Sequence, residues 1–164
     1  MRVLFLAALV LAATITSASA ADVEANKKLY RDFVETVINK RQPDAAGRFM
    51  SEGLIEHNPN IAQVGRGKFL AAVLAGFSDY HGEIQDILAE GDKIVVRTVW
   101  TGTQDGPFLG LPPSGRKLKF TTADFFRIEN GKLAEHWDVV DSLPRAIALG
   151  LVPPPQTPAQ SAPK

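Results

Sequence analysis

A histidine and an aspartate two residues apart, His136 and Asp138, are the pair in this chain best suited by type and spacing to chemistry. On a β-strand, residues two apart point to the same face, so the imidazole and the carboxylate would lie side by side. Burying such groups is costly unless they are paired. A shielded carboxylate has a raised pKa and is a better base, and the imidazole can bind a substrate oxygen or accept a proton. On a solvated face the pair would carry no function.

Three further groups are candidates for substrate binding. His57-Asn58-Pro59 forms either a plain turn, because Asn-Pro initiates turns, or part of a pocket wall. His81 follows a predicted helix and either stabilises its end or contacts a ligand. Arg97 stands among valines of a predicted strand, where it is either solvated or binds a substrate anion or a pocket carboxylate.

Metal ligation is another interpretation of these histidines and aspartates. His136 and Asp138 can supply two ligands from one strand face, with His57 as a third. The chain has no dense ligand motif, so we expect no metal and no cofactor. A serine hydrolase is disfavoured because no Gly-x-Ser-x-Gly elbow occurs. The chain has no cysteine, which excludes thiol catalysis, disulfides and zinc–thiolate sites.

The first half of the chain has the periodicity of helices. Apolar residues recur at spacings of three and four within residues 22–41, which predicts a long amphipathic helix. Pro43 suits the first turn of a short helix that runs to about Met50. A third helix is expected near residues 67–80, and residues 54–59 are expected to be extended and to end in a turn.

The second half alternates with period two and predicts four antiparallel strands, at residues 83–90, 93–103, 117–129 and 132–141. Asn130-Gly131 is a strong hairpin signal. A last short helix is expected from Ser142, as its cap, to Gly150. Helices followed by a meander predict an α+β domain. The helices can cover only one face of the sheet, and a sheet that curls around them encloses a cavity.

The register of the last two strands decides whether Asp124 meets Asp138. A two-residue turn at Asn130-Gly131 places Asp124 opposite Trp137, whereas one additional bulge places it opposite Asp138, and the sequence leaves both open. Alternation predicts one face with Thr122, Asp124, Phe126 and Ile128 on the first strand and Ala134, His136, Asp138 and Val140 on the second. The other face of the second strand is expected to carry Leu133, Glu135, Trp137 and Val139.

The two ends of the chain differ from the rest. Arg2, the apolar run 3–15 and Ala18-Ser19-Ala20 have the pattern of a secretory signal peptide, so we expect residues 1–20 to be removed from an exported, periplasmic or secreted protein. An N-terminal membrane anchor is the alternative, although the run is short for a bilayer. The domain is expected at 21–152, with a disordered proline-rich tail at 153–164. Eighteen acidic and eighteen basic residues give no charge excess for nucleic acid or a membrane surface.

Four segments, in this order, resemble the SnoaL-like polyketide cyclases of the nuclear transport factor two-like superfamily. They are residues 56–59, the Gly- and Pro-rich residues 102–103 and 106–115, residues 124–132 and residues 135–138. The resemblance covers most of the predicted domain. It implies a cone-shaped α+β fold, often dimeric, with N-terminal helices packed on a strongly curved, mostly antiparallel sheet that encloses a pocket.

The cyclases of that family catalyse an intramolecular aldol condensation without metal or cofactor. The resemblance implies that Asp138 is the base and that Asp124 is its partner, where the cyclases have a histidine, with His57, Asn58 and His136 lining the cavity. The candidate catalytic residues are therefore Asp138, His136 and Asp124. The candidate residues for binding a small-molecule substrate are His57, Asn58, Arg97, Phe126 and His81.

Two alternative functions remain open. The pocket can bind a small apolar or carbonyl ligand without chemistry, because one fold hosts many functions. Epoxide hydrolysis by two aspartates and an arginine would use Asp124, Asp138 and Arg97, although Val99 stands where that arrangement has an acid. In each case the uncovered face of the sheet, with Trp137, is expected to form a homodimer interface.

Overall fold

The computed structural model describes residues 20–155. The predicted signal peptide, apart from Ala20, and the predicted tail beyond residue 155 lie outside these residues. Within residues 20–155, no helix combines the length and the apolar character needed to cross a membrane.

The N-terminal helices follow the predicted periodicity. Helix α1 (Ala20–Phe33) continues into the π-helical segment η1 (Val34–Asn39), and a 3₁₀ helix η2 (Pro43–Arg48) follows. One stripe of α1 and η1 is buried in the core because its apolar side chains recur on one face. This stripe consists of Tyr30, Phe33, Val34, Val37 and Ile38.

The sheet has five strands in the order β1-β5-β4-β3-β2. The predicted meander is confirmed: β2 (His81–Glu90), β3 (Lys93–Thr103), β4 (Lys117–Glu129) and β5 (Lys132–Val140) pair antiparallel. The predicted extended segment is the end of a longer strand, β1 (Met50–Glu56), which pairs parallel to β5.

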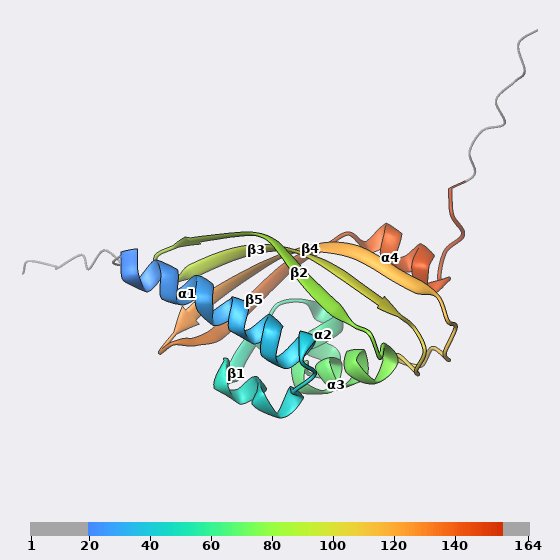
Figure 1. The fold of residues 1–164 in the computed structure, drawn as a ribbon, viewed down its shortest axis with the longest axis horizontal. Coiled ribbons are helices and arrows are strands. Elements are labelled where there is room, and N and C mark those ends of the chain that lie inside the picture. The colour runs from blue at the N-terminus through green and yellow to red at the C-terminus, as the bar shows by residue number, and fades with distance from the viewer. Residues whose placement is uncertain (1–19, 156–164) are drawn as a thin grey trace, which may run out of the picture.

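Three shorter helices complete the fold. α2 (Pro59–Val64) was expected only as a turn, α3 (Arg66–Gly76) ends earlier than predicted, and α4 (Ser142–Leu149) packs against β4. Figure 1 shows the sheet curled without closing, with α1, α2 and α3 on its concave side. The predicted α+β cone is thus confirmed.

The start of α4 differs from the prediction. Asp141, not Ser142, occupies the N-cap position, and no side chain caps the helix. The Ser142 hydroxyl instead donates to the backbone carbonyl of Val140 at 3.1 Å. The end is as predicted, because Gly150 adopts the left-handed conformation, with φ of 75°, that terminates helices readily.

The hairpin between β4 and β5 contains both a tight turn and a bulge. Asn130 and Gly131 have positive φ angles of 52° and 69°, as a two-residue turn requires. The register then shifts by one residue at Ala134, so that Asp124 pairs with Asp138. The bulge also corrects the prediction for Leu133, which is fully buried in the core instead of lying on the outer face.

Candidate active site

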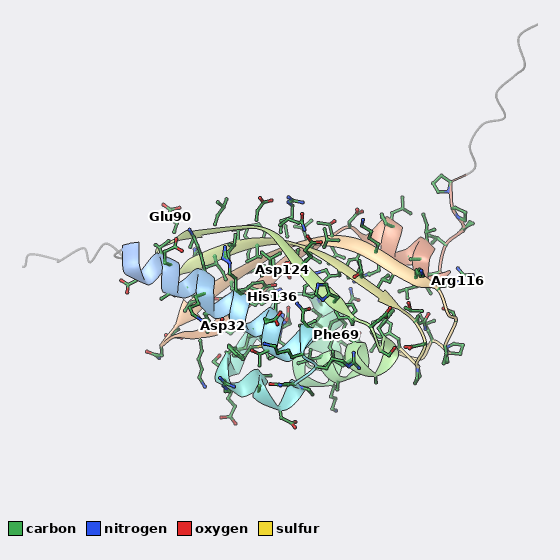
Figure 2. All side chains as sticks on the ribbon, viewed as in Figure 1. Asp32, Phe69, Glu90, Arg116, Asp124 and His136 are labelled. Carbon is green, nitrogen blue, oxygen red and sulfur yellow. The ribbon has the colours of Figure 1, made fainter. Side chains whose placement is uncertain are left out.

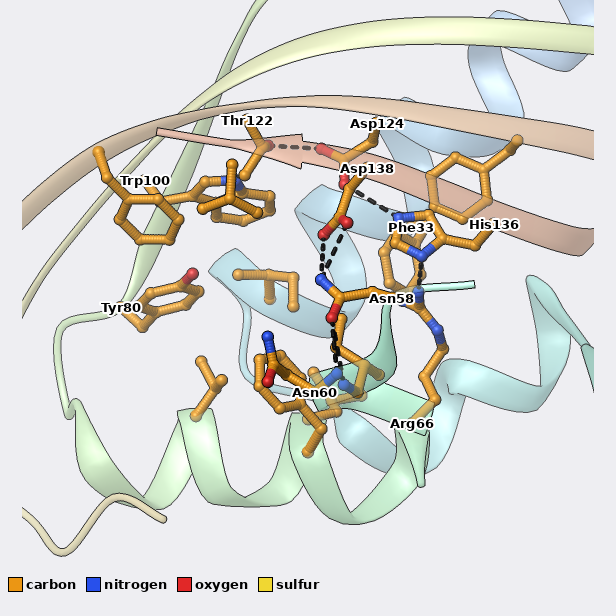
Figure 3. Close-up of a pocket in the computed structure, with 18 of the residues that line it drawn as sticks. Phe33, Asn58, Asn60, Arg66, Tyr80, Trp100, Thr122, Asp124, His136 and Asp138 are labelled. Carbon is orange, nitrogen blue, oxygen red and sulfur yellow. Dashed lines mark hydrogen bonds and ion pairs between the residues drawn. The ribbon is translucent and has the colours of Figure 1, made fainter. Parts of the chain in front are cut away.

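A cavity of about 120 Å³ lies between the concave face of the sheet and the helices. Most of its wall is aromatic or aliphatic, and most of its polar groups gather where β4 and β5 meet the starts of α2 and α3 (Figure 3). Figure 2 places Asp124 and His136 close together in this space. The polar lining residues are Asn58, Asn60, Arg66, Thr122, Asp124, His136, Asp138 and Arg145.

His136 stands between two carboxylates. Its Nε2 lies 3.1 Å from Oδ1 of Asp124 on the adjacent strand β4, and its Nδ1 lies 2.8 Å from Oε1 of Glu56. The second contact follows from the parallel pairing of β1 with β5, which sets Glu56 beside His136. The side chain of His136 is 2 % exposed, so these ionisable groups form a buried network.

Arg66 completes this network from α3. Its Nε donates to Oε2 of Glu56 at 2.8 Å, and its Nη2 contacts both Glu56 and Nδ1 of His136. Burial lowers the pKa of His136, but the hydrogen bonds to Asp124 and Glu56 outweigh it and raise that pKa above its ordinary value. Burial raises the pKa of Glu56, but His136 and Arg66 outweigh it and hold that pKa below its usual range.

Asn58 fixes the position of Asp138. Its Nδ2 donates to both carboxylate oxygens of Asp138, at 2.9 and 2.8 Å. Its Oδ1 accepts from the backbone N–H groups of Asn60 and Ile61 at 2.9 and 3.4 Å, which makes it the N-cap of α2. Because the oxygen is held by the cap, the amide nitrogen faces the carboxylate (Figure 3).

Asp138 has no basic side chain within 4 Å among the residues that the structure describes. Asp124 and Glu56 differ, because they pair with His136 and Arg66 respectively. The Asp138 side chain is also only partly buried. Asp138 is therefore the lining carboxylate that is not neutralised by an ion pair and that faces the cavity.

A second chain of hydrogen bonds holds Asp124. The indole N–H of Trp100 donates to the Thr122 hydroxyl at 2.8 Å, which donates to Oδ2 of Asp124 at 2.5 Å. Tyr80 stacks on Trp100 with ring centroids 5.5 Å apart, and its hydroxyl points into the cavity in Figure 3. Burial, and then the charge of Asp124, raise the pKa of Tyr80, which keeps this phenol protonated.

The structure brings five of the predicted site residues into the cavity lining and leaves three outside. Phe126, Asn58, Asp124, His136 and Asp138 line the cavity. His57 does not, contrary to the expectation. Its ring is 41 % exposed, stacks on Trp137 at 4.6 Å and bonds Oε1 of Glu135 at 2.9 Å. Asn58 turns inward, whereas its neighbour His57 faces outward.

Arg97 and His81 also lie outside the cavity. Arg97 is exposed on β3 and its Nε donates to Asp86 at 2.6 Å. His81 is exposed at the first residue of β2 instead of at a helix end. The combination of Asp124, Asp138 and Arg97 needed for epoxide hydrolysis is therefore not assembled.

Asp124, His136 and Asp138 can each offer one metal-ligand atom, and these atoms lie within 4.8 Å of one another. Both ring nitrogens of His136 already contact carboxylate oxygens, so coordination would break one of these contacts. The cluster differs from the one considered from sequence, because His57 is not part of it.

Sequence reasoning missed Glu56, Arg66, Tyr80 and Arg145. The position of Glu56 could have been predicted, because it stands two residues before Asn58 in an extended segment and therefore points to the same side as Asn58. No sequence pattern indicates Arg66 or Tyr80, because their places in the lining depend on how α3 and the segment after it pack under the sheet. The same holds for Arg145, which reaches the cavity from α4.

The model of one protein family, described as SnoaL-like polyketide cyclase, matches residues 28–148. The chain belongs to the SnoaL-like polyketide cyclase family. The matched segment contains Glu56, Asn58, Asp124 and the β5 pair His136 and Asp138, so the network described above lies within the family domain.

Individual proteins are similar to this chain over most of their own length. The aklanonic acid methyl ester cyclase DnrD of Streptomyces peucetius is 28% identical over 123 residues, which cover 70% of this chain and 83% of the relative. AclR of Streptomyces galilaeus, a proposed hydroxylase, superposes with a TM-score of 0.72 at 26% identity, over 80% of this chain and 99% of AclR. TsrD of Streptomyces laurentii gives 0.70 at 29% identity, over 82% and 99%.

Proposed function

We propose that this SnoaL-like protein is a cofactor-independent acid–base enzyme acting on a small carbonyl compound, with Asp138 as the base. The observation that carries the proposal is the environment of Asp138. Its carboxylate is oriented by Asn58, faces the cavity and has no cationic partner within 4 Å in residues 20–155. A base must be free to take a proton, and an ion-paired carboxylate is a weaker one.

The reaction begins with transfer of a proton from the carbon next to a substrate carbonyl to a carboxylate oxygen of Asp138. The electron pair of the broken C–H bond moves onto the carbonyl oxygen and forms an enolate. The protonated Tyr80 hydroxyl is a suitable donor to that oxygen, because donors aimed at developing charge stabilise it. In an aldol cyclisation the enolate carbon then attacks a second carbonyl of the same molecule, and the new alkoxide takes the proton back from Asp138.

The other acids have a supporting role in this scheme. Asp124 and Glu56 flank His136, whose raised pKa favours the imidazolium form. Together with Arg66, these three side chains link β1, β4 and β5 at the cavity. His136 is therefore a positioning residue, because both of its ring nitrogens are engaged.

The test is solvent deuterium incorporation into 1-phenylbutane-1,3-dione, followed by mass spectrometry and corrected for buffer. The wild-type protein should accelerate exchange, and Asp138→Asn should lose at least about 99% of that acceleration, since a general base contributes typically 10²–10⁴-fold. Asp86→Asn is the matched control, because Asp86 is exposed on the outer face. Exchange by Asp138→Asn at the wild-type rate would reject the proposal.

The second candidate is a non-catalytic binding protein for a small apolar or carbonyl ligand. The predominantly apolar wall of the cavity favours it. A wild-type protein that binds 1-phenylbutane-1,3-dione in calorimetry but leaves its exchange rate at the buffer value would select this function.

We further propose that the protein is exported and acts as a homodimer. Export is supported by the signal-peptide pattern in residues 1–20. Expression of the full chain in a Gram-negative host, followed by periplasmic extraction and N-terminal sequencing, should give a mature protein that starts at Ala21. A cytoplasmic protein that retains Arg2 would contradict export.

A further inference from the structure

Arg145 occupies the junction of two hollows. The inner cavity described above is adjoined by an outer, more polar one of about 260 Å³, whose lining includes His57, Pro59 and Ser142. The residues that line both hollows are Asn58, Asn60, Asp138, Val140 and Arg145. Arg145 and Asp138 therefore lie at the same boundary between the inner and the outer hollow.

This guanidinium lacks an acidic partner. Within residues 20–155, no carboxylate lies within 4 Å of Arg145, although Arg66 and Arg97 each pair with one and Arg127 pairs with two. Arg145 is half-buried, and its Cζ lies 5.6 Å from the centroid of the Phe120 ring. Burial and the charge of Asp124 raise the pKa of Tyr80, and the charge of Arg145 opposes this rise without outweighing it.

A half-buried cation held over an aromatic ring is a good receptor for an anion. The planar guanidinium can form two parallel hydrogen bonds to a carboxylate. Because it is weakly hydrated, replacing its bound water by ligand oxygens costs little hydration free energy. Asp138 lines the same junction, so a carboxylate on Arg145 would place the rest of the ligand against the proposed base.

We infer that Arg145 is the anion-binding residue of this pocket and that the substrate is a small carbonyl compound carrying a carboxylate. The inference rests on the proposed function and names its substrate class. The inner cavity of about 120 Å³ is somewhat smaller than a dry cavity of roughly 150 Å³ that holds benzene, and together with the adjoining outer hollow of about 260 Å³ it has room for one ring or a short chain. This class differs from the methyl ester in the name of the Streptomyces peucetius cyclase.

Calorimetric titration with 4-acetylbenzoate and 4-acetylbenzamide tests the inference, because these probes differ in charge but hardly in shape. The wild-type protein should bind the carboxylate at least about tenfold more tightly at low salt, with a smaller preference at 0.5 M salt. Arg145→Gln should bind both probes equally, and Arg145→Lys should keep part of the preference. Thermal unfolding of each variant checks that it is folded.

Arg48→Gln is the matched control, since Arg48 also stacks on a phenylalanine, Phe49 at 5.4 Å, but lies outside the cavity. It should keep the wild-type preference. Equal binding of both probes by the wild-type protein, or a preference retained in Arg145→Gln, would overturn the inference.

Asp138→Asn separates this inference from the proposed function, because binding does not require turnover. This variant should still prefer the carboxylate. If it does so while its deuterium exchange stays at the wild-type rate, the proposed base fails and the role of Arg145 stands. If exchange is abolished but the wild-type protein shows no preference, only the role of Arg145 fails.

Discussion

The side-chain amide of Asn58 donates to both carboxylate oxygens of Asp138, at 2.9 and 2.8 Å, across 80 residues of sequence. The same amide caps α2 through its oxygen. One side chain therefore couples the start of a helix under the sheet to the proposed base on β5. This coupling holds the Asp138 carboxylate in one orientation relative to α2.

Asn58→Ala should lower the rate of deuterium exchange by about 10- to 100-fold, the range typical of lost orienting contacts around a functional group. It should also destabilise the protein by about 1 kcal/mol, because the cap of α2 is lost. Asn58→Ser separates the two effects, since serine caps helices but has no amide to donate. A Ser variant with wild-type exchange would show that the contact to Asp138 is dispensable.

Tyr80→Phe should reduce exchange by about 10²-fold, the effect of removing one donor to a developing oxyanion. Its unfolding free energy should change little, because the ring still stacks on Trp100. Tyr30→Phe is the control, as Tyr30 of α1 also lines the cavity but is buried in the core and packs against Phe126 of β4. Exchange that is unchanged in Tyr80→Phe would remove the phenol from the scheme.

Much of the fold follows from the periodicity of the sequence. The stripe that contains Tyr30 and Phe33 predicted the long helix, and the alternation around Asp124 and His136 predicted which residues of β4 and β5 face inward. Leu133 shows the limit of such reasoning. A single bulge at Ala134 moved it to the core, and a bulge depends on three-dimensional packing instead of on a local pattern.

The site was less predictable than the fold. Asn58 and His57 are adjacent, and only the register of β1 with β5 and the cap of α2 show which one turns inward. Arg97 looked suitable by residue type, but the polar side of the cavity takes its arginines, Arg66 and Arg145, from helices. Long side chains on helices reach a cavity from positions that strand alternation does not describe.

The stability of the fold should depend on pH through His136. Its pKa is raised on folding, so its contribution is fully present below the ordinary value of 6.5 and is lost as pH rises through the folded-state pKa. Glu56 acts in the opposite sense, because its lowered pKa gives stability above 4.5 that is lost as pH falls through the folded-state value. The wild-type protein should therefore exceed His136→Gln in unfolding free energy by a constant amount between pH 4.5 and pH 6.5. Above pH 6.5 this difference should shrink.

Urea denaturation from pH 4 to 9 measures this difference, which should reach about 3 kcal/mol where both partners are charged, as for the removal of one member of a buried pair. His57→Gln is the control, since this ring is 41 % exposed. A wild-type excess over His136→Gln that stays constant from pH 6 to 9 would contradict the assignment.

Removal of metal ions should not change activity. The contacts of both His136 ring nitrogens with Asp124 and Glu56 compete with coordination at the Asp124–His136–Asp138 cluster. Dialysis against EDTA should leave both the exchange rate and the melting temperature at their starting values, and added Zn²⁺ should not raise the rate. An exchange rate lost on chelation and restored by Zn²⁺ would make the cluster a catalytic metal site.

The outer face of the sheet should form the homodimer interface. A row of apolar side chains crosses it from strand to strand, from Leu88 on β2 through Val95 and Phe125 to Trp137 on β5. Leu88 and Phe125 are 70% and 40% exposed, and such a continuous apolar row on a protein surface marks an interaction site.

Sedimentation velocity at micromolar concentration should give a dimer. Phe125→Glu should give a monomer with an unchanged circular dichroism spectrum, because a charge in the middle of the row would be buried without a partner in the dimer. Leu109→Glu, which adds the same charge at an exposed leucine outside the sheet, should remain dimeric. A wild-type protein that sediments as a monomer at every concentration tested would refute this interface.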